Sequence, residues 1–183
     1  NSLATSLLLF TILFYVFIYT FWLKRTTSLN IVIGGAAGAI PPIIGWTAVV
    51  PELSFLPISL FIIIFFWTPP HFWALAQHLA DDYKKAGFPV MPLVYGQKYT
   101  NYLIAIYSLA LLPISLYFWI IGVASSFYAF IAIVMGIGFL YTVFLSFKKK
   151  NHYILVFLFS IFYMLVINLS LAADILLSVS GSF

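Results

Sequence analysis

The residues best suited to chemistry are concentrated between Trp67 and Pro92. This segment contains two of the three histidines and two of the four acidic residues, together with Lys84 and Lys85. Ionisable groups are costly inside a membrane, so a polar stripe that runs from an apolar helix into a charged loop indicates a functional site. A carboxylate there offers Mg²⁺ an oxygen ligand, and lysines balance phosphate charge. The segment is therefore compatible with a magnesium-bound diphosphate.

The spacing of the polar residues predicts which of them share a face. On a continuous helix, His71, His78 and Asp82 fall within about 60° of one another, which predicts one stripe with Asp82 at its charged end. Asp81 lies about 100° away from Asp82, so both carboxylates could not face one cavity, and Asp82 is the preferred ligand. The alternative is an ordinary cytoplasmic loop that is rich in basic residues. On the pattern alone, that alternative is favoured.

The rest of the chain has the composition of an integral membrane protein. Of its 183 residues, 64% are hydrophobic and 7% are charged, and the mean hydropathy is +1.15. Each apolar run has about 20 residues or more, enough to cross a hydrocarbon core of about 30 Å. These runs lie at residues 3–23, 29–50, 55–80, 101–121, 125–147 and 153–180. We therefore predict an all-α bundle of six transmembrane helices that forms one membrane domain over residues 1–183.

The basic residues predict the orientation of this bundle. All eight follow the first, third or fifth run, and Lys and Arg are retained in short cytoplasmic loops, so both chain ends are expected outside. The eight are Lys24, Arg25, Lys84, Lys85, Lys98, Lys148, Lys149 and Lys150. The net charge of +4 then reflects anionic lipid headgroups, and no nucleic-acid partner is expected. The absence of cysteine excludes disulfides and Cys-ligated metals within the chain.

Three segments of the sequence, within residues 19–96, resemble motifs of one enzyme family and occur in the same order as in that family. The first two are YTFWLKRT from Tyr19 and NIVIGGAAGAIPPIIGW from Asn30. The third is TPPHFWAL from Thr68, followed by Asp82-Tyr83, Ala86-Gly87 and Pro89-Val-Met-Pro92. The chain thus resembles the protohaem IX farnesyltransferases, or haem O synthases, which are UbiA-type intramembrane prenyltransferases.

The resemblance implies a reaction and its participants. A farnesyl group would pass from farnesyl diphosphate to a vinyl group of haem b, with water added and diphosphate released, on the route to haem A. Mg²⁺ would accompany the diphosphate, and haem b would be a substrate. The implied partners are haem A synthase or terminal-oxidase assembly. The implied location is the bacterial inner membrane, with the charged loops cytoplasmic, or the mitochondrial inner membrane in a eukaryote.

The family has nine helices and two acidic motifs, and this sequence matches the second motif. We therefore expect helices four to nine here, with the N-terminal helices and the first acidic motif missing, and no activity from this part alone. Three earlier helices starting in the cytoplasm would deliver Asn1 outside, as the charges also predict. The later motif often has a second acid three or four residues on, whereas Lys85 and Ala86 stand there in this chain.

The resemblance implies roles for the residues of this chain that match the family's motifs. Asp82, aided by Asp81, is the expected ligand of the magnesium diphosphate. Lys24 and Arg25 are expected to contact the diphosphate. The phenol of Tyr19 either contacts diphosphate or helps to quench charge, and the alternative is an interfacial tyrosine.

Further substrate contacts are expected around this core of charges. Lys84 and Lys85 join the phosphate cluster, although loop basicity accounts for at least one of them. Asn30 either lines the same entrance or caps the helix that begins there. His78 is closer to the surface than His71 and is suited to either phosphate or haem.

His71 and the nearby aromatic residues are candidates for the haem and the farnesyl chain. A neutral imidazole can bind haem iron, and the alternative for His71 is a structural bond to a carbonyl freed by Pro69 or Pro70. Trp67 and Trp73 are best placed to line a farnesyl tunnel and shield a cation.

Other features of the chain leave alternatives open. The small residues from Gly34 to Ala39 either let helices approach closely or leave room for a tetrapyrrole, and Pro41 and Pro42 should kink that helix. Asp174 lies toward the opposite membrane surface and receives no catalytic role. The competing functions are a proton-coupled transporter, with the histidines and Asp82 as relay, and an oxidase-assembly scaffold.

Overall fold

The computed structural model describes residues 1–149 and 152–180, which are mostly helical and are joined by short loops and turns. Lys150, one of the residues that predict orientation, lies outside the described residues. Six helical stretches are long and apolar enough to cross a membrane. They are Ser2–Thr26, Asn30–Val49, Phe55–His78, Gln97–Ile120, Ser126–Lys148 and Tyr153–Ser178. The predicted all-α bundle of six transmembrane helices is confirmed.

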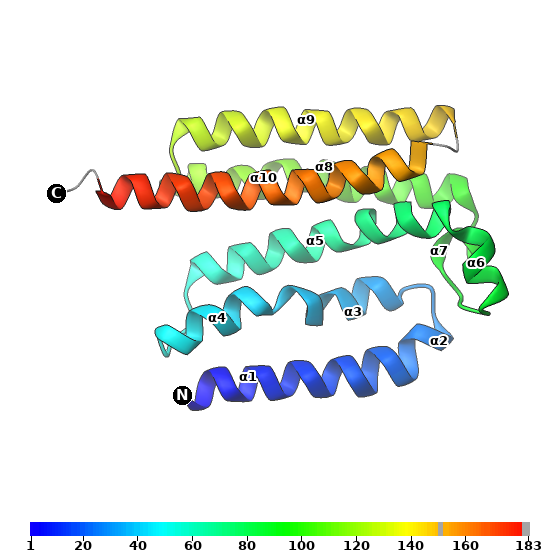
Figure 1. Cartoon of the computed structure of the whole chain (residues 1–183), viewed down its shortest axis with the longest axis horizontal. Coiled ribbons are helices and arrows are strands. Elements are labelled where there is room, and N and C mark those ends of the chain that lie inside the picture. Colours follow the sequence, from blue (N-terminus) through cyan, green and yellow to red (C-terminus); the bar gives the residue numbers. More distant parts are fainter. Residues whose placement is uncertain (150–151, 181–183) are drawn as a thin grey trace.

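The first two spans are each divided into shorter elements, whereas the other four are continuous (Figure 1). The elements are α1 (Ser2–Leu13), the π-helix η1 (Phe14–Leu23), α2 (Lys24–Thr26), α3 (Asn30–Ala39), α4 (Pro41–Val49), α5 (Phe55–His78), α6 (Ala80–Lys85), α7 (Met91–Val94), α8 (Gln97–Ile120), α9 (Ser126–Lys148) and α10 (Tyr153–Ser180).

The proline pairs have different effects on the two helices that contain them. Pro41 and Pro42 begin α4, directly after the end of α3, so the predicted kink in the second span is confirmed. Pro is suited to the first turn of a helix, where its missing N–H has no partner to lose. Pro69 and Pro70 instead lie inside the continuous α5, where the packing of neighbouring helices maintains the helix.

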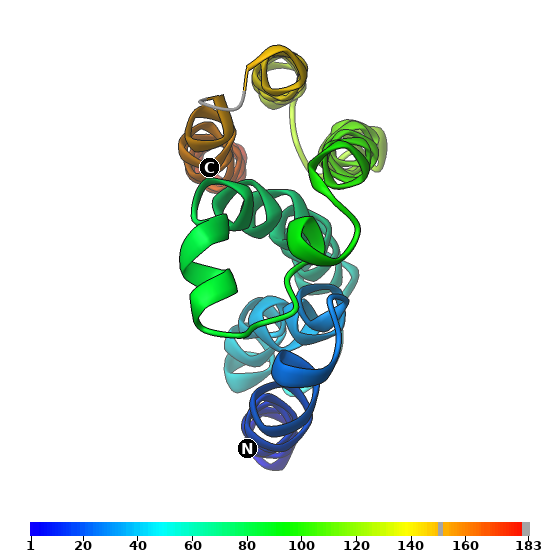
Figure 2. The ribbon, with the colours of Figure 1, turned by 90° about the vertical axis from the view of Figure 1, so that its right-hand side faces the viewer.

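Helix α5 is the centre of the bundle. It packs against α8 and α10, which pack in turn against α9, and on its other side it packs against α3 and α4 (Figure 2). The α1 and η1 segment lies beyond α3 and α4. The side chains of Trp73, Phe118, Tyr128, Phe139 and Tyr163 fill the core and are almost completely buried.

Polar groups also join the helices of this core. The hydroxyl groups of Ser115 and Tyr163 are 2.5 Å apart, and the Tyr128 hydroxyl donates to the Ser115 carbonyl oxygen at 3.0 Å. Interhelical hydrogen bonds of this kind hold membrane helices together. Asp174 accepts hydrogen bonds from the backbone N–H and the hydroxyl of Ser125, so this carboxylate joins α10 to the start of α9.

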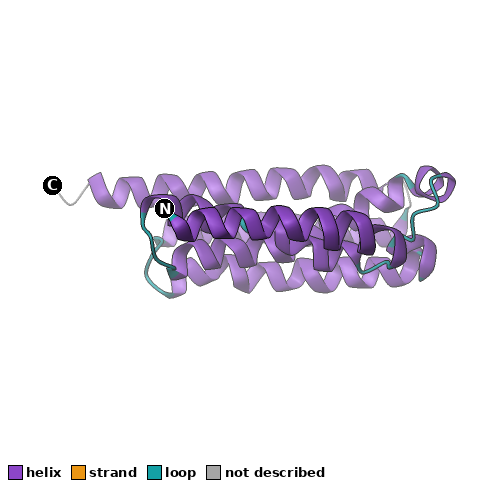
Figure 3. Cartoon of the chain, turned by 90° about the horizontal axis from the view of Figure 1, so that it is seen from below, coloured by secondary structure: helices purple, strands orange, loops and turns teal. Residues whose placement is uncertain are grey.

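The two ends of the bundle differ in charge. The elements α2, α6 and α7 lie at one end, where α9 finishes, and the loops joining α4 to α5 and α8 to α9 lie at the other (Figures 1 and 3). We call the first of these the basic end, because the described Lys and Arg residues are on elements that finish, begin or lie there. The location of these Lys and Arg residues at one end of the bundle agrees with the one-sided distribution predicted from the sequence.

Candidate functional site

The helix that carries both histidines does not continue to Asp82. Helix α5 ends at His78, and Leu79 leaves the helical conformation with φ −101° and ψ 27°. A new helix, α6, begins at Ala80, and its first turn is closed by the N–H groups of Asp82 and Tyr83 bonding to the Leu79 carbonyl oxygen. The prediction of one continuous stripe from His71 to Asp82 is therefore wrong, because the change of direction at Leu79 resets the helical phase (Figure 1).

The two adjacent carboxylates lie on the exposed side of α6. Asp81 and Asp82 are both exposed. Asp82 is 3.8 Å from the Lys85 ammonium, with 71% and 80% of the two side chains exposed. A solvated pair of this kind contributes little to stability, so the Asp82 carboxylate is available to another cation.

Tyr83, on the same short helix, connects α6 to two other elements. Its ring meets Phe72 of α5 edge to face, with ring centroids 5.9 Å apart. Its phenol is also close enough to act electrostatically on the phenol of Tyr19 in η1. Burial raises the pKa of Tyr83 above the ordinary value of 10.0. Tyr83 stands beside Asp82 in the segment that resembles the family, but the sequence predicted no role for it, because its contacts depend on the break at Leu79.

The end of α6 brings the following loop against Lys24. The N–H of Gly87 bonds to the Lys84 carbonyl oxygen, and the N–H of Phe88 bonds to the Tyr83 carbonyl oxygen. With Gly87 at φ +71°, these bonds form a Schellman cap, which glycine favours because it has no Cβ. The cap directs Phe88 beneath the Lys24 ammonium, which lies 5.3 Å from the ring centroid.

The structure thus brings together two segments that are far apart in the sequence. Tyr19 and Lys24 come from η1 and α2, and Tyr83 and Phe88 come from α6 and its cap. The two aspartates share the short helix with Tyr83. We call this arrangement the α2–α6 site.

The remaining basic candidates are solvent-exposed around the α2–α6 site. Arg25, Lys84 and Lys85 are exposed, and Lys85 is the one of them with an ion pair among the described residues. Exposed guanidinium and ammonium groups can bind an anion, and exposed carboxylates can bind the metal ion that the anion carries.

Asn30 has a different role from the capping that the sequence allowed. The residue is 4% exposed and begins α3, whose N-cap is Leu29, with no side-chain capping bond. Its side-chain amide donates to the Thr27 carbonyl oxygen at 2.6 Å. Asn30 therefore fixes the tight turn between α2 and α3, and the capping alternative is wrong.

His71 faces α10 and is enclosed by aromatic rings. Its ring stacks on Trp67 at 4.2 Å and on Phe157 at 4.6 Å, measured between centroids. Its Nδ1 is 2.7 Å from the hydroxyl oxygen of Ser160, and that hydroxyl donates to the Phe157 carbonyl oxygen at 2.6 Å. The hydroxyl therefore accepts from Nδ1–H, which leaves the lone pair on Nε2.

This arrangement excludes one of the two interpretations of His71. Its described partner is a serine hydroxyl from α10, so the bond to a carbonyl freed by Pro69 or Pro70 is wrong. A neutral imidazole that is oriented through Nδ1 and carries a lone pair on Nε2 is the form that binds metals.

The other aromatic and histidine candidates occupy separate surroundings. Trp67 donates from its indole nitrogen to the Ser160 carbonyl oxygen at 2.8 Å. Trp73 is 1% exposed and meets Tyr107 of α8 edge to face at 5.5 Å, so it is a core residue between α5 and α8. His78 is exposed in the last turn of α5.

The α2–α6 site offers two carboxylates to a metal ion. No group of three or more His, Cys, Asp or Glu side chains lies close enough to hold a metal within the part of the chain that the structure describes. Mg²⁺ commonly uses one or two carboxylates and completes its shell with waters and substrate phosphates. Asp81 and Asp82 fit that limited contribution.

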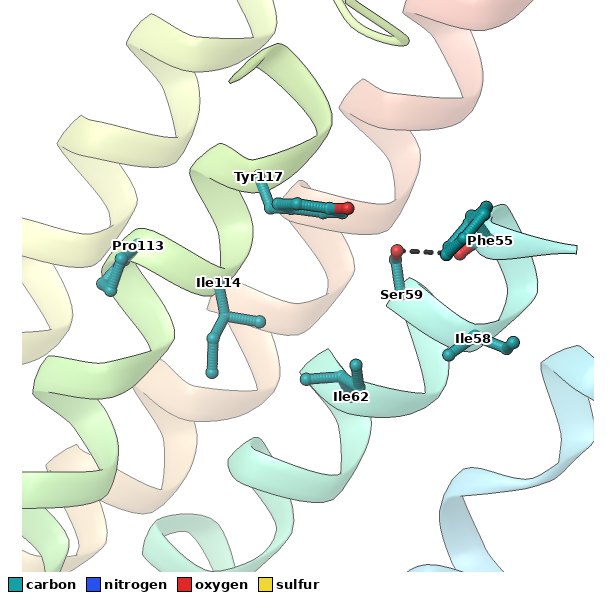
Figure 4. Close-up of a pocket in the computed structure, with 7 residues that line it drawn as sticks. All are labelled: Phe55, Ile58, Ser59, Ile62, Pro113, Ile114 and Tyr117. Carbon is teal, nitrogen blue, oxygen red and sulfur yellow. Dashed lines mark hydrogen bonds between the residues drawn. The ribbon is translucent and has the colours of Figure 1, made fainter. Parts of the chain in front are cut away.

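An apolar cavity of about 450 Å³ lies at the opposite end of α5 (Figure 4). Its lining comes from the first turns of α5 and the later part of α8, including Ile58, Ile62 and Ile114. The Ser59 hydroxyl already donates to the Phe55 carbonyl oxygen at 2.8 Å. The cavity contains no charged residue and is unsuited to a diphosphate.

Comparisons with known proteins agree with this picture. Residues 1–166 match the UbiA prenyltransferase family. A protoheme IX farnesyltransferase from Parvibaculum lavamentivorans is 46% identical over 180 residues, which cover 92% of this chain and 57% of the relative. One from Pelagibacter ubique is 61% identical over 113 residues, which cover 62% of this chain and 37% of the relative.

A third relative, protoheme IX farnesyltransferase 2 from Mesorhizobium japonicum, is 52% identical over 141 residues, or 77% of this chain and 45% of the relative. The chain spans about half the length of the curated relatives it matches. No solved structure matches it significantly.

Proposed function

The chain belongs to the UbiA prenyltransferase family, and on that premise we propose that it forms helices four to nine of a haem O synthase, or protohaem IX farnesyltransferase. The observation that carries the proposal is the α2–α6 site, where Lys24 lies over the Phe88 ring and Tyr19 interacts electrostatically with Tyr83, on the short helix that carries the two exposed carboxylates. The names of the relatives support the choice of substrates. A prenyltransferase family also favours an enzyme over a transporter or an assembly scaffold.

The proposed reaction breaks the allylic C–O bond of farnesyl diphosphate and releases diphosphate. The vinyl group of haem b donates its π electrons to the farnesyl carbon, so that a C–C bond forms and a cation develops beside the porphyrin. Water adds to that cation and loses a proton, which leaves a hydroxyl group. Mg²⁺, when bound with the diphosphate, supplies charge stabilisation of the leaving group.

In the α2–α6 site, the acidic residues are proposed to bind the metal and the basic residues to bind the diphosphate. Asp82 and Asp81 provide the carboxylate oxygens for the metal. The ammonium groups of Lys24 and Lys84 and the guanidinium group of Arg25 hold the diphosphate oxygens through charge-assisted hydrogen bonds.

Two further members of the site assist this binding. Lys85, after releasing Asp82, adds a third ammonium group. The Tyr19 phenol donates a hydrogen bond to the diphosphate. Such pre-positioned donors contribute most where negative charge develops on the leaving group.

The haem is proposed to lie on the α10 side of α5. His71 offers the Nε2 lone pair to the iron, because Nδ1 is engaged by Ser160, and Trp67 stacks on the opposite side of the imidazole from Phe157. His78, exposed at the end of α5, contacts a haem propionate or the diphosphate. Trp73 is buried and supports α5 by packing.

The orientation and the missing ligands follow from the same premise. We propose that the basic end is cytoplasmic, because Lys and Arg are retained on that side, and that the protein lies in a bacterial inner membrane, since the relatives named above come from bacteria. The family's earlier helices, with their own acidic motif, would complete the metal site. The product would pass to haem A synthase or to oxidase assembly.

The direct test is haem O formation in membranes that carry this chain joined to its native upstream coding sequence. Haem b, farnesyl diphosphate and Mg²⁺ are supplied, and the product is identified by chromatography and mass spectrometry. Asp82→Asn should lower the rate at least 100-fold, since removal of a group that stabilises leaving-group charge has about this effect. The control is Glu52→Gln, which neutralises an exposed acid in the α4–α5 loop at the other end.

The two outcomes test the haem O synthase activity and the role of Asp82 separately. Full activity in Asp82→Asn would place the metal elsewhere. Absence of haem O from the correctly inserted parent protein would refute the enzyme hypothesis.

A further inference from the structure

A polar cavity lies at the basic end, separate from the α2–α6 site. It has a volume of about 400 Å³ and is lined by residues from the first turns of α8 and α10 and from the end of α9. Helices α8, α9 and α10 pack side by side on one side of α5 (Figure 2). Lys24 and Phe88 belong instead to the part of the bundle near α3. None of the residues assigned to the proposed reaction lines this cavity.

The charge of the cavity is positive and is not neutralised by a described carboxylate. Lys98, Lys148 and Lys149 line it, and the ion pairs of the described residues include none of them. Lys148 lies over the Phe144 ring at 4.7 Å. Two of the four acids of the chain are on α6, and Asp174 and Glu52 belong to the opposite end. Three lysines that line one cavity favour an anion there.

The floor of the cavity offers hydrogen-bond donors. Asn101 is 4% exposed, and its side-chain oxygen accepts from the buried Gln77 amide at 2.8 Å. The remaining polar part of the Asn101 side chain is its NH₂ group, a donor. Helix α8 begins after Gly96, which has no side chain to cap the first-turn N–H groups. These N–H groups and the helix dipole also favour negative charge.

An apolar edge adjoins these donors. Phe147 lines the cavity, and its ring contacts Tyr102 with centroids 5.4 Å apart. Both rings are exposed. A ligand here therefore meets cations and amide donors at one end and aromatic surface at the other, at the level where spanning helices reach the membrane surface.

We propose that this cavity binds the phosphate headgroup of an anionic phospholipid, with the glycerol region against Phe147 and Tyr102. Basic pockets between transmembrane helices are suited to such headgroups. The positive-inside rule explains lysines in loops, but it requires neither a cavity nor a buried amide donor beneath them. The proposal is independent of the haem O synthase assignment, since it concerns binding alone.

The test measures lipid binding to the full protein, including its native upstream sequence, by native mass spectrometry in detergent. Cardiolipin is titrated against phosphatidylcholine. The variant Lys98→Gln/Lys149→Gln should bind cardiolipin about 25-fold more weakly, since each lysine near the membrane surface contributes about fivefold. Both lysines are exposed, so their replacement leaves the core unchanged.

The matched control is Lys84→Gln/Lys85→Gln, which removes two charges from α6 at the same end of the bundle. It should retain cardiolipin binding within about twofold. Equal weakening in both double variants would show general surface attraction and overturn the proposed site. Equal affinity for cardiolipin and phosphatidylcholine would overturn it as well.

A second variant and a second ligand sharpen the assignment. Asn101→Asp keeps an oxygen for the Gln77 amide but places negative charge at the floor, and it should weaken cardiolipin binding while phosphatidylcholine binding stays constant. Inorganic diphosphate is added as a competitor. Micromolar diphosphate could displace cardiolipin from the parent protein but not from Lys98→Gln/Lys149→Gln. That result would show that the cavity binds a soluble phosphate and would overturn the proposal of a lipid ligand.

Discussion

The ring of Tyr19 lies directly against the backbone of Gly34, where any Cβ would overlap the ring carbons Cδ2 and Cγ. Tyr19 belongs to η1, where the Thr20 hydroxyl bonds to the Tyr15 carbonyl oxygen five residues back. The contact fixes the position of the Tyr19 ring, and the Tyr19 phenol interacts electrostatically with Tyr83, so the absence of a side chain at Gly34 serves the α2–α6 site.

Gly34→Ala should therefore disturb Tyr19 more than a methyl group normally would. The added carbon meets the base of a tyrosine ring, which cannot rotate away without moving η1, and overpacking of this kind costs about 1–3 kcal/mol. We expect a lower unfolding temperature and a several-fold loss of haem O formation.

The control for this change is Gly38→Ala on the same helix. A Cβ at Gly38 has nothing within 4 Å, and alanine is the better helix former. Gly38→Ala should leave the unfolding temperature equal or higher, with activity retained. The same loss in both variants would mean that α3 tolerates no substitution and that the Tyr19 contact is unimportant.

Gly87→Ala tests whether the cap of α6 positions Phe88 and Lys24. The backbone of Gly87 has φ +71°, and a Cβ there meets nothing within 4 Å, so the effect is purely conformational. A non-glycine residue in this left-handed region costs about 1–2 kcal/mol. We expect a several-fold rise in the KM for farnesyl diphosphate with a smaller change in kcat.

Gly45→Ala provides the comparison, because it lies within α4 with free space around it and no positive φ. Its kinetics should match those of the parent protein. If Gly87→Ala also leaves KM unchanged, the cap has no part in binding the diphosphate.

The sequence predicted the fold well because each spanning helix is encoded locally. An apolar run of sufficient length has few stable alternatives in a bilayer, and all six runs form helices. The kink at Pro41 was predictable for the same reason, since proline acts on its own backbone.

The arrangement of the site was less predictable because it depends on one residue that leaves the helix. Nothing in the types of Leu79 and Ala80 indicates a break, so the helical-phase argument continued past the end of α5. Tyr83 was missed for that reason. The serine that orients His71 is 89 residues away in the sequence, and no spacing rule connects positions on different helices.

Tyr83 should make the stability of the protein depend on alkaline pH. Burial raises the pKa of its phenol above 10.0, so between 10.0 and the raised value the unfolded chain releases a proton that the folded chain retains. The free energy of unfolding then falls as the pH rises above about 10. Denaturant unfolding at pH 8 and pH 11 measures this, and Tyr83→Phe should show a smaller fall. An identical fall in both proteins would assign it to other tyrosines.

His71 and Ser160 make the haem proposal testable without turnover. If Nε2 binds the iron, haem b added to the full protein should give a shifted Soret band that His71→Gln abolishes. Ser160→Ala removes the acceptor of the Nδ1 proton, and loss of such an orienting partner lowers metal affinity about 10-fold to 100-fold. Ser170→Ala is the control, since that hydroxyl bonds only within α10 among the described residues, to the Ile167 carbonyl oxygen. An unchanged Soret band in His71→Gln would make the imidazole a packing element between Trp67 and Phe157 and would require another ligand for the haem.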